Sequence, residues 1–345
     1  MSAWMVLWAF VPLAVVADLL GWPPVVVFGA AALGVVPLAR LLGQATEELA
    51  LRAGPRAGGL LNATLGNAAE LIIAIFAIRK GLLELVKASI TGSILGNILL
   101  ILGMGFLLGG RCHGIQRFDR GQAGVNATML TLAVIALAVP SLFGHTIEEV
   151  SHLAVEYLSL GVAGVMMLLY ILSVAYSFGL PLREGEAHTP QRWSTPVTLG
   201  ALAGSTALIA WLSEILVGAV EPVVLSLGVT EFFLGIVVVP LVGNVVEHLV
   251  AIQMAMKDRM ELSLAISLGS GLQVALFVAP VLVFASLALG NPLTLLFNQF
   301  ELVALVAASL LATLAALDGE SNWLEGAQLL AVYVIVALAF FFLPA

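Results

Sequence analysis

Two short stretches of the sequence place a glutamate three residues after a Gly-Asn pair. They read GNAAE at residues 66–70 and GNVVE at residues 243–247. Each glutamate lies within an apolar run of membrane-spanning length, where an ionised carboxylate costs about 2.5–3.5 kcal/mol on insertion scales. A carboxyl group in such a place is normally protonated, paired with a base or bound to a cation. The chemistry of Glu70 and Glu247 therefore needs an explanation.

The polar residues near the two glutamates offer only hard oxygen donors. The amide and hydroxyl candidates are Asn67, Asn244, Asn97, Gln273, Ser93 and Ser270. Ca²⁺ takes about 6–8 such oxygens at about 2.3–2.6 Å, and soft-metal ligands are absent because the chain has one cysteine. Gly66 and Gly243 precede the asparagines and could let each helix unwind, which would free backbone carbonyls for a cation. The alternative interpretation of these glycines is close helix packing through small residues.

Burial also provides a way to couple two ions. A carboxyl group that is removed from water binds a proton more readily, so Ca²⁺ and protons compete for the same oxygens. A site with two carboxylates is near neutral with Ca²⁺ or with two protons, whereas the empty ionised site is strongly charged. The pair Glu70 and Glu247 is predicted to bind both ions alternately. A structural ion pair is the alternative, with Lys87 as a partner for Glu70 and His248 adjoining Glu247.

The composition identifies the environment that must hold these residues. With 61% hydrophobic residues, 10% charged residues and a mean hydropathy of +1.12, the 345-residue chain is predicted to be an all-α polytopic membrane protein. Apolar runs of about 20 residues predict about eleven transmembrane helices. Their approximate ranges are 3–20, 22–43, 58–79, 82–109, 121–142, 154–178, 196–218, 230–256, 261–289, 299–317 and 323–343.

The two motifs belong to a longer internal repeat. Residues 65–103 align without a gap to residues 242–280, and the identical pairs include polar residues that apolar composition does not explain. Five predicted spans separate the copies, so corresponding helices cross the membrane in opposite directions. The predicted layout is an extra N-terminal helix (1–21), a first five-helix repeat (22–178), an inter-repeat loop (179–195) and a second, inverted five-helix repeat (196–345). Such a repeat should bring Glu70 and Glu247 face to face.

The basic residues fall mostly on one side of this layout. Ten of the thirteen Lys and Arg residues lie on the side of the N-terminus; the exceptions are Arg79, Lys80 and Lys87. The positive-inside rule therefore predicts a cytoplasmic N-terminus and an outside C-terminus. Three acids close to the repeats, Glu47, Glu48 and Glu231, are candidates for the lining of cation entrances.

Three stretches of the sequence resemble the repeats of the calcium/proton antiporters, the cation exchanger (CAX) branch of the calcium/cation antiporter superfamily. Two of them are GNAAELIIAIFAIRKGLLELVKASITGSILGN and PLVGNVVEHLVAIQMAMKDRMELSLAISLGSGLQ. The resemblance extends through ATEELALRAGPRAGGLLNATLGNAAE. The resemblance implies eleven helices, Glu70 and Glu247 as the alternately exposed Ca²⁺/H⁺ site, and residues 22–52 and 196–225 as a sliding gating bundle. Sodium-coupled relatives carry Ser/Thr-rich segments before each glutamate, where this chain has Ala68-Ala69 and Val245-Val246. The short N-terminus favours a prokaryotic plasma membrane.

Other classes of protein fit less well. A sodium- or potassium-coupled exchanger of Ca²⁺ or another divalent cation is the main alternative, and a passive Ca²⁺ channel is a further one. An intramembrane metalloprotease would need paired ligands such as HExxH, but the five histidines are scattered. The sequence thus predicts a secondary transporter rather than an enzyme, with no cofactor and no nucleic-acid partner. Its predicted partners are the bilayer, Ca²⁺ and protons. The sequence does not predict an oligomeric state.

Overall fold

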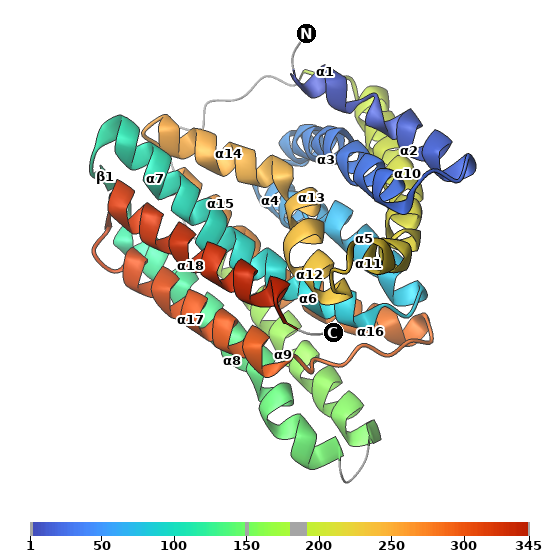
Figure 1. The fold of residues 1–345 in the computed structure, drawn as a ribbon. Helices are drawn as coiled ribbons and strands as arrows, with labels where there is room; N and C mark the ends of the chain where they lie inside the picture. The colour runs from blue at the N-terminus through green and yellow to red at the C-terminus, as the bar shows by residue number, and fades with distance from the viewer. Residues whose placement is uncertain (1–2, 149–151, 180–191, 344–345) are drawn as a thin grey trace.

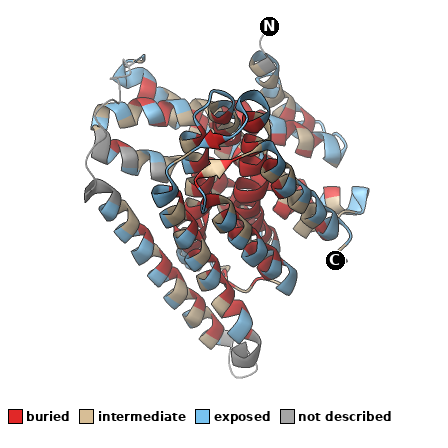
Figure 2. Cartoon of the chain, turned by 90° about the vertical axis from the view of Figure 1, so that its left-hand side faces the viewer, coloured by how far each residue is buried: buried red, intermediate tan, exposed pale blue. Residues whose placement is uncertain are grey.

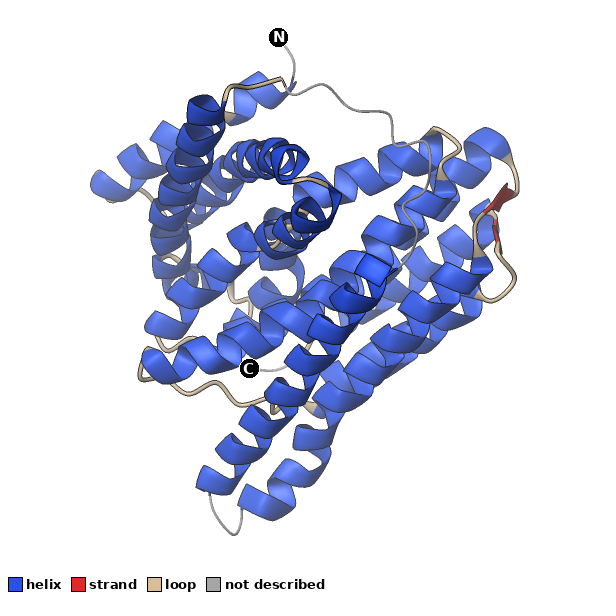
Figure 3. Cartoon of the chain, turned by 180° about the vertical axis from the view of Figure 1, so that it is seen from behind, coloured by secondary structure: helices blue, strands red, loops and turns tan. Residues whose placement is uncertain are grey.

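The computed structural model describes the chain except for residues 1–2, 149–151, 180–191 and 344–345 (Figure 1). The described residues are almost entirely helical, and their two strands, β1 (Gln116–Arg117) and β2 (Glu320–Ser321), form one short antiparallel pair (Figure 3). The prediction of an all-α membrane protein is therefore confirmed. Most of the predicted 179–195 loop lies outside the described residues.

Helices of the first half of the chain run up to the undescribed segment 180–191. They are α1 (Ala3–Leu7), α2 (Phe10–Leu19), α3 (Pro24–Ala53), α4 (Pro55–Leu65), α5 (Ala68–Arg79), α6 (Leu83–Leu95), the π-helical segment η1 (Gly96–Ile101), α7 (Leu102–His113), α8 (Arg120–Glu148) and α9 (His152–Gly179). Those of the second half are α10 (Thr195–Gly218), α11 (Val220–Leu227), α12 (Glu231–Phe233), η2 (Leu234–Val238), α13 (Val239–Gly243), α14 (Val245–Met256), α15 (Met260–Gln273), η3 (Val274–Val278), α16 (Ala279–Ala288), α17 (Gln299–Ala316) and α18 (Trp323–Phe341).

Most of the predicted spans form helices of membrane-crossing length. Eight helical segments of the described chain are long and apolar enough to cross a bilayer, and a ninth is formed if the pair Glu231–Gly243 and Val245–Met256, bent by 64°, counts as one broken span. The remaining two predicted spans, 3–20 and 58–79, are each built from two shorter helices, α1 with α2 and α4 with α5. Broken spans are expected only where the freed backbone groups are covered by protein or line a cavity.

The centre of the molecule is formed by the helices that follow the two Gly-Asn motifs. Figure 2 shows buried residues concentrated in the inner helices and exposed residues on the outer faces of the peripheral ones. α6 packs against η2, α14 packs against α7 and α15, and the long helices α3 and α10 pack along each other at the edge of this core (Figure 1). The two motifs thus lie inside the fold rather than on its surface.

One glycine sets the closest approach in the core. Gly92 of α6 lies against the backbone of Ile236 in η2, so closely that a Cβ atom at position 92 would overlap the Ile236 carbonyl group. Small residues allow membrane helices to approach in this way. The contact places Ser93, the next residue of α6, beside the broken helix of the second motif.

Candidate functional site

Each Gly-Asn pair interrupts a helix. α4 ends at Leu65 and α5 begins at Ala68, while α13 ends at Gly243 and α14 begins at Val245. The asparagines between them have non-helical backbone angles, with φ −92° and ψ 13° at Asn67 and φ −110° and ψ 7° at Asn244. The N-terminal ends of α5 and α14 therefore lie inside the protein, where their unpaired N–H groups carry partial positive charge.

The two glutamates occupy equivalent places at these helix ends. Glu70 and Glu247 are each the third residue of the helix that follows the break. The first turn of a helix favours negative charge, because the partial charge at the N-terminus attracts it. Both carboxyl groups are therefore placed where a protein can stabilise an anion inside a membrane.

Glu70 is enclosed by side chains of both motifs. It is 3% exposed, and its Oε1 atom accepts a hydrogen bond from the hydroxyl of Ser93 in α6. Asn244 donates to the same oxygen at 3.5 Å and to the Ser93 hydroxyl oxygen at 3.2 Å. The other oxygen, Oε2, is buried and has no hydrogen-bond partner among the described residues. A buried carboxylate oxygen in that state is costly, because it has lost its water without a replacement.

Glu247 is placed differently. The Ser270 hydroxyl of α15 donates to its Oε2 atom at 2.5 Å, as Ser93 does to Glu70. Glu247 and Ser270, however, line a cavity of about 600 Å³ that extends past Gln44 and Glu47, two exposed residues of α3. Glu247 is therefore reached from one side of the molecule, whereas Glu70 is closed off.

The two motifs cross at their glycines. A Cβ atom on Gly66 would lie 3.2 Å from Oε1 of Glu247, and one on Gly243 would lie 3.6 Å from Cβ of Glu70. Each glutamate thus packs beside the glycine of the other motif. The asparagines also reach across instead of capping their own helices: Asn67 donates to Oε1 of Gln273 at 2.7 Å, and Asn244 contacts Glu70 and Ser93.

The predicted site residues consequently form two adjoining groups. One contains Glu70, Ser93 and Asn244; the other contains Glu247, Ser270, Gln273 and Asn67. Asn97 is 1% exposed, and its side-chain amide donates to the backbone carbonyl of Ser93, four residues earlier, at 3.0 Å.

The basic partners considered for the glutamates are engaged or placed elsewhere. Nζ of Lys87 lies 2.5 Å from Oε1 of Glu84, one turn away on α6, so Lys87 forms its ion pair with Glu84 and not with Glu70. His248 is 5% exposed, and its Nε2 atom is buried without a hydrogen-bond partner in the part of the chain that the structure describes. The structure therefore pairs the glutamates with hydroxyls and amides, not with bases.

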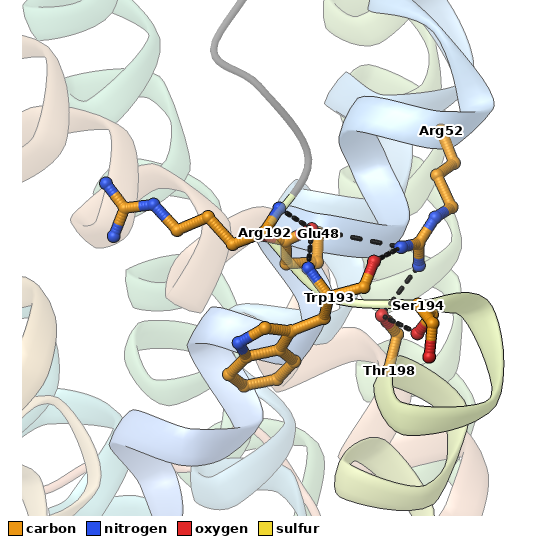
Figure 4. A network of polar contacts seen from close by, with 6 residues as sticks. All are labelled: Glu48, Arg52, Arg192, Trp193, Ser194 and Thr198. Atoms are coloured by element: carbon orange, nitrogen blue, oxygen red, sulfur yellow. Dashed lines mark hydrogen bonds and ion pairs between the residues drawn. The ribbon is translucent and has the colours of Figure 1, made fainter.

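Two neighbouring acids on α3 have different surroundings. Glu47 lines the cavity that leads to Glu247, but Glu48 does not. The Glu48 carboxylate accepts hydrogen bonds from the backbone N–H groups of Arg192 and Trp193, while Arg52 donates to Thr198 Oγ1 at 2.6 Å and to the Trp193 carbonyl (Figure 4). Glu48 and Arg52 thus connect the end of α3 to the start of α10, and in this structure Glu48 is buried and does not line this cavity. Glu231 accepts from the Leu85 backbone N–H at 3.1 Å, outside this cavity.

One buried acid was not recognised from the sequence. Glu301 of α17 is 1% exposed and accepts a hydrogen bond from Thr91 of α6 at 2.8 Å. It also forms a capping box with Asn298, in which each side chain bonds the backbone N–H of the other. The sequence signal was the N-x-x-E spacing before an apolar run. Glu301 ties α17 to the helix that carries Ser93.

The donor set limits which ions the site can hold. Within the described ranges, no three His, Cys, Asp or Glu side chains gather closely enough to hold a metal ion. A cation at the motifs would therefore need the two carboxylates together with amide, hydroxyl and backbone oxygens. These are the ligands that a hard ion such as Ca²⁺ accepts.

Comparisons with known proteins agree on one family. Residues 23–179 and 197–342 match the sodium/calcium exchanger protein family. The chain is 44% identical to a Ca²⁺/H⁺ antiporter of Synechocystis sp. (strain ATCC 27184 / PCC 6803 / Kazusa), over 99% of this chain and 97% of the relative. It is 42% identical to the Ca²⁺/H⁺ antiporter ChaA of Bacillus subtilis (strain 168), over 97% of each. The solved structure of native YfkE matches with a TM-score of 0.87 and 40% identity, over 99% of this chain and 100% of YfkE.

Proposed function

The chain belongs to the sodium/calcium exchanger protein family, and we propose that it is a secondary transporter that exchanges Ca²⁺ for protons across a membrane. Two relatives that align over nearly the whole chain are named Ca²⁺/H⁺ antiporters, which supports this activity and not an enzymatic one. A prokaryotic plasma membrane is the proposed location. Ca²⁺ and protons are its substrates.

One observation carries the proposal: the two motif glutamates lie at inward helix ends, each with a serine hydroxyl and the glycine of the other motif beside it. The buried, unpartnered Oε2 atom of Glu70 requires a proton or a cation when that carboxyl group is inside the closed protein. Two protons or one Ca²⁺ leave the pair near neutral. The ionised pair without either ion has the largest desolvation cost, so its passage through the closed state is disfavoured.

The remaining residues of the site have proposed roles as oxygen donors and helix breaks. Ca²⁺ would bind to Glu70 and Glu247, with oxygens drawn from Asn67, Asn244, Asn97, Gln273, Ser93 and Ser270. Gly66 and Gly243 would let the helices break at the asparagines that follow them, which would free backbone carbonyls and let the two carboxyl groups approach. On proton binding, the serine hydroxyls remain as hydrogen-bond partners for the carboxyl groups.

Alternating access would come from movement of the long helices at the edge of the core. In the structure the cavity leads from Glu247 toward Gln44 and Glu47 near the end of α3, the side that the positive-inside rule assigns to the cytoplasm. α3 and α10 pack along each other and are fastened by Glu48 and Arg52, which supports their movement as one gating bundle. Sliding of this bundle, the first helix of each inverted repeat, over the remaining helices of the two repeats would close the path to Glu247 and open one to Glu70.

Proton coupling is favoured over sodium coupling by the residues before each glutamate. Ala68-Ala69 and Val245-Val246 have no side-chain oxygens, so these positions provide no side-chain ligands for an alkali ion. A sodium- or potassium-coupled exchanger remains the alternative outcome of the test below.

The test is Ca²⁺ uptake into everted membrane vesicles after an imposed pH jump, without Na⁺ or K⁺. The parent should accumulate radioactive calcium, and Glu70→Gln and Glu247→Gln should each reduce uptake to the level of vesicles that lack the protein. Glu221→Gln is the matched control, because Glu221 is an exposed acid of α11 that does not line the cavity.

Two results would contradict the proposal. Proton-driven uptake retained by either variant would exclude the paired-glutamate site. Uptake that needs an alkali-ion gradient and ignores the pH jump would exclude proton exchange and favour the alternative.

A further inference from the structure

One basic residue, Arg40 of α3, lines the cavity that leads to Glu247. Gln44 and Glu47 follow it four and seven residues later and line the same cavity, so the three side chains share one face of the helix. At about 1.5 Å per residue, Arg40 lies about 10 Å farther than Glu47 from the C-terminal end of α3. A fixed positive charge is therefore present on the wall of a passage that is proposed to carry a cation.

The guanidinium group of Arg40 is held by an aromatic ring and not by an acid. Its Cζ atom lies 4.0 Å from the centre of the Trp4 ring in α1. Arg40 forms no ion pair in the part of the chain that the structure describes, although Glu47 and Glu247 line the same cavity. Trp4 itself does not line this cavity. The stacking contact therefore draws the charged end of Arg40 toward α1, to the edge of the passage.

This contact positions the charge of Arg40 without cancelling it. The face of an aromatic ring attracts a guanidinium group, but the ring has no net charge. The field of Arg40 therefore still acts on ions in the cavity, and the repulsion grows with the charge of the ion. Such fields are focused in a cleft with low-dielectric walls. A Ca²⁺ ion in the passage is thus attracted by Glu47 and Glu247 and repelled by Arg40.

We infer that Arg40 limits the Ca²⁺ affinity of the open site and that Trp4 is the residue that positions it. The inference rests on the proposed function, in which Ca²⁺ enters through this cavity. With its guanidinium group stacked on Trp4, Arg40 weakens Ca²⁺ binding through space and leaves the carboxylate oxygens of Glu247 free. Without the ring, the same long side chain can lean into the cavity and pair with the carboxylates, where it competes with Ca²⁺.

The first test is Ca²⁺ uptake into everted vesicles after a pH jump at low ionic strength. Arg40→Gln should lower the half-saturating Ca²⁺ concentration about threefold, and this effect should shrink as salt is added. Arg40→Lys keeps the charge and should stay close to the parent value. Arg111→Gln is the matched control, because Arg111 is an exposed arginine of α7 that does not line the cavity.

The second test concerns Trp4. Trp4→Leu should raise the half-saturating Ca²⁺ concentration about twofold, because the freed guanidinium group can pair with the cavity carboxylates. Trp4→Phe keeps an aromatic face and should have a smaller effect. In the Arg40→Gln background, Trp4→Leu should have no effect on this concentration, because Trp4 acts only through Arg40.

Equilibrium binding of radioactive Ca²⁺ to the purified, folded protein separates this inference from the proposed function. Binding needs no proton gradient, so Arg40→Gln should bind Ca²⁺ about threefold more tightly than the parent even where the parent shows no uptake after a pH jump. Equal Ca²⁺ affinities of the parent and Arg40→Gln would overturn the inference and leave Arg40 and Trp4 as an anchor at the membrane–water interface. An equal effect of Trp4→Leu with and without Arg40 would overturn the positioning role of Trp4.

Discussion

Residues 65–103 and 242–280 carry the same motif, yet the structure gives their glutamates different surroundings. Glu70 is 3% exposed and closed in by Ser93 and Asn244, with one oxygen that lacks a partner among the described residues. Glu247 has the equivalent serine, Ser270, but lines a cavity of about 600 Å³. Two copies of one motif therefore occupy different states in the same molecule.

The difference between the copies is one of access rather than of local chemistry. Both glutamates are third residues of a helix, and both accept from a serine 23 positions later. What differs is the packing above them: the end of α3 leaves a path to Glu247. An exchanger needs such an inequality, because a site open to both sides at once would let ions leak.

The first prediction concerns access at the two equivalent serines. In a Cys112→Ser background, which removes the exposed native thiol, Ser270→Cys should react with a charged, membrane-impermeant thiol reagent. Ser93→Cys should react about a hundredfold more slowly, because the reagent must wait for the closed half to open. Labelling rates in mild detergent measure this. In denaturing detergent the two thiols should react alike, and equal rates in the folded protein would contradict the asymmetry.

The second prediction concerns the two crossing glycines. A Cβ atom on Gly66 would lie 2.6 Å from the carbonyl oxygen of Asn62, whereas one on Gly243 has its nearest contact at 3.6 Å. Gly66→Ala should therefore destabilise the protein by about 2 kcal/mol, and Gly243→Ala should change stability by less than about 0.5 kcal/mol. Thermal unfolding in detergent measures both. Gly269→Ala is the control, because nothing lies within 4 Å of the new methyl group. Equal losses of stability in Gly66→Ala and Gly243→Ala would show that the two glycines are packed alike and would contradict this prediction.

The third prediction concerns the serine hydroxyls. Ser93→Ala removes a donor from a carboxyl group that water does not reach and a proposed oxygen ligand of Ca²⁺, so the half-saturating Ca²⁺ concentration should rise by about tenfold. Ser270→Ala should raise this concentration by about threefold or less, because water in the cavity can replace the lost hydroxyl. Transport at graded Ca²⁺ concentrations measures both. Ser267→Ala, which removes a hydroxyl bonded only along α15, should leave the value unchanged; the reverse ranking of Ser93 and Ser270 would contradict the difference in solvent access.

The fourth prediction concerns the cavity entrance. Glu47 is exposed and lines the cavity, so Glu47→Gln should raise the half-saturating Ca²⁺ concentration by about two- to threefold at low salt. The effect should shrink as ionic strength rises, because exposed charges are screened. An effect that is independent of salt would place Glu47 in the binding site itself and not at its entrance.

The local features of the site were predictable from the sequence. A Gly-Asn pair before a buried glutamate, repeated with opposite predicted orientation, identified Glu70 and Glu247 and their serines, because a charge inside a membrane needs partners close by. Other residues were not predictable in this way. Glu47 and Glu48 are adjacent in sequence, yet only Glu47 lines the cavity, and the hydrogen bonds of Glu48 come from the backbone of residues 192 and 193, far away in the chain.

Composition alone established that this chain is a helical membrane protein, and the repeated motif alone identified the residues whose burial demands a ligand. Both conclusions rest on local physics: apolar runs favour the bilayer, and an isolated carboxylate there is costly. The tertiary structure decided that each glutamate packs beside the glycine of the other motif and that Asn244 contacts Ser93. It also decided that Glu247, and not Glu70, lines an open cavity. Two nearly equivalent segments cannot encode that inequality locally, because it depends on where the long helices α3 and α10 pack over them.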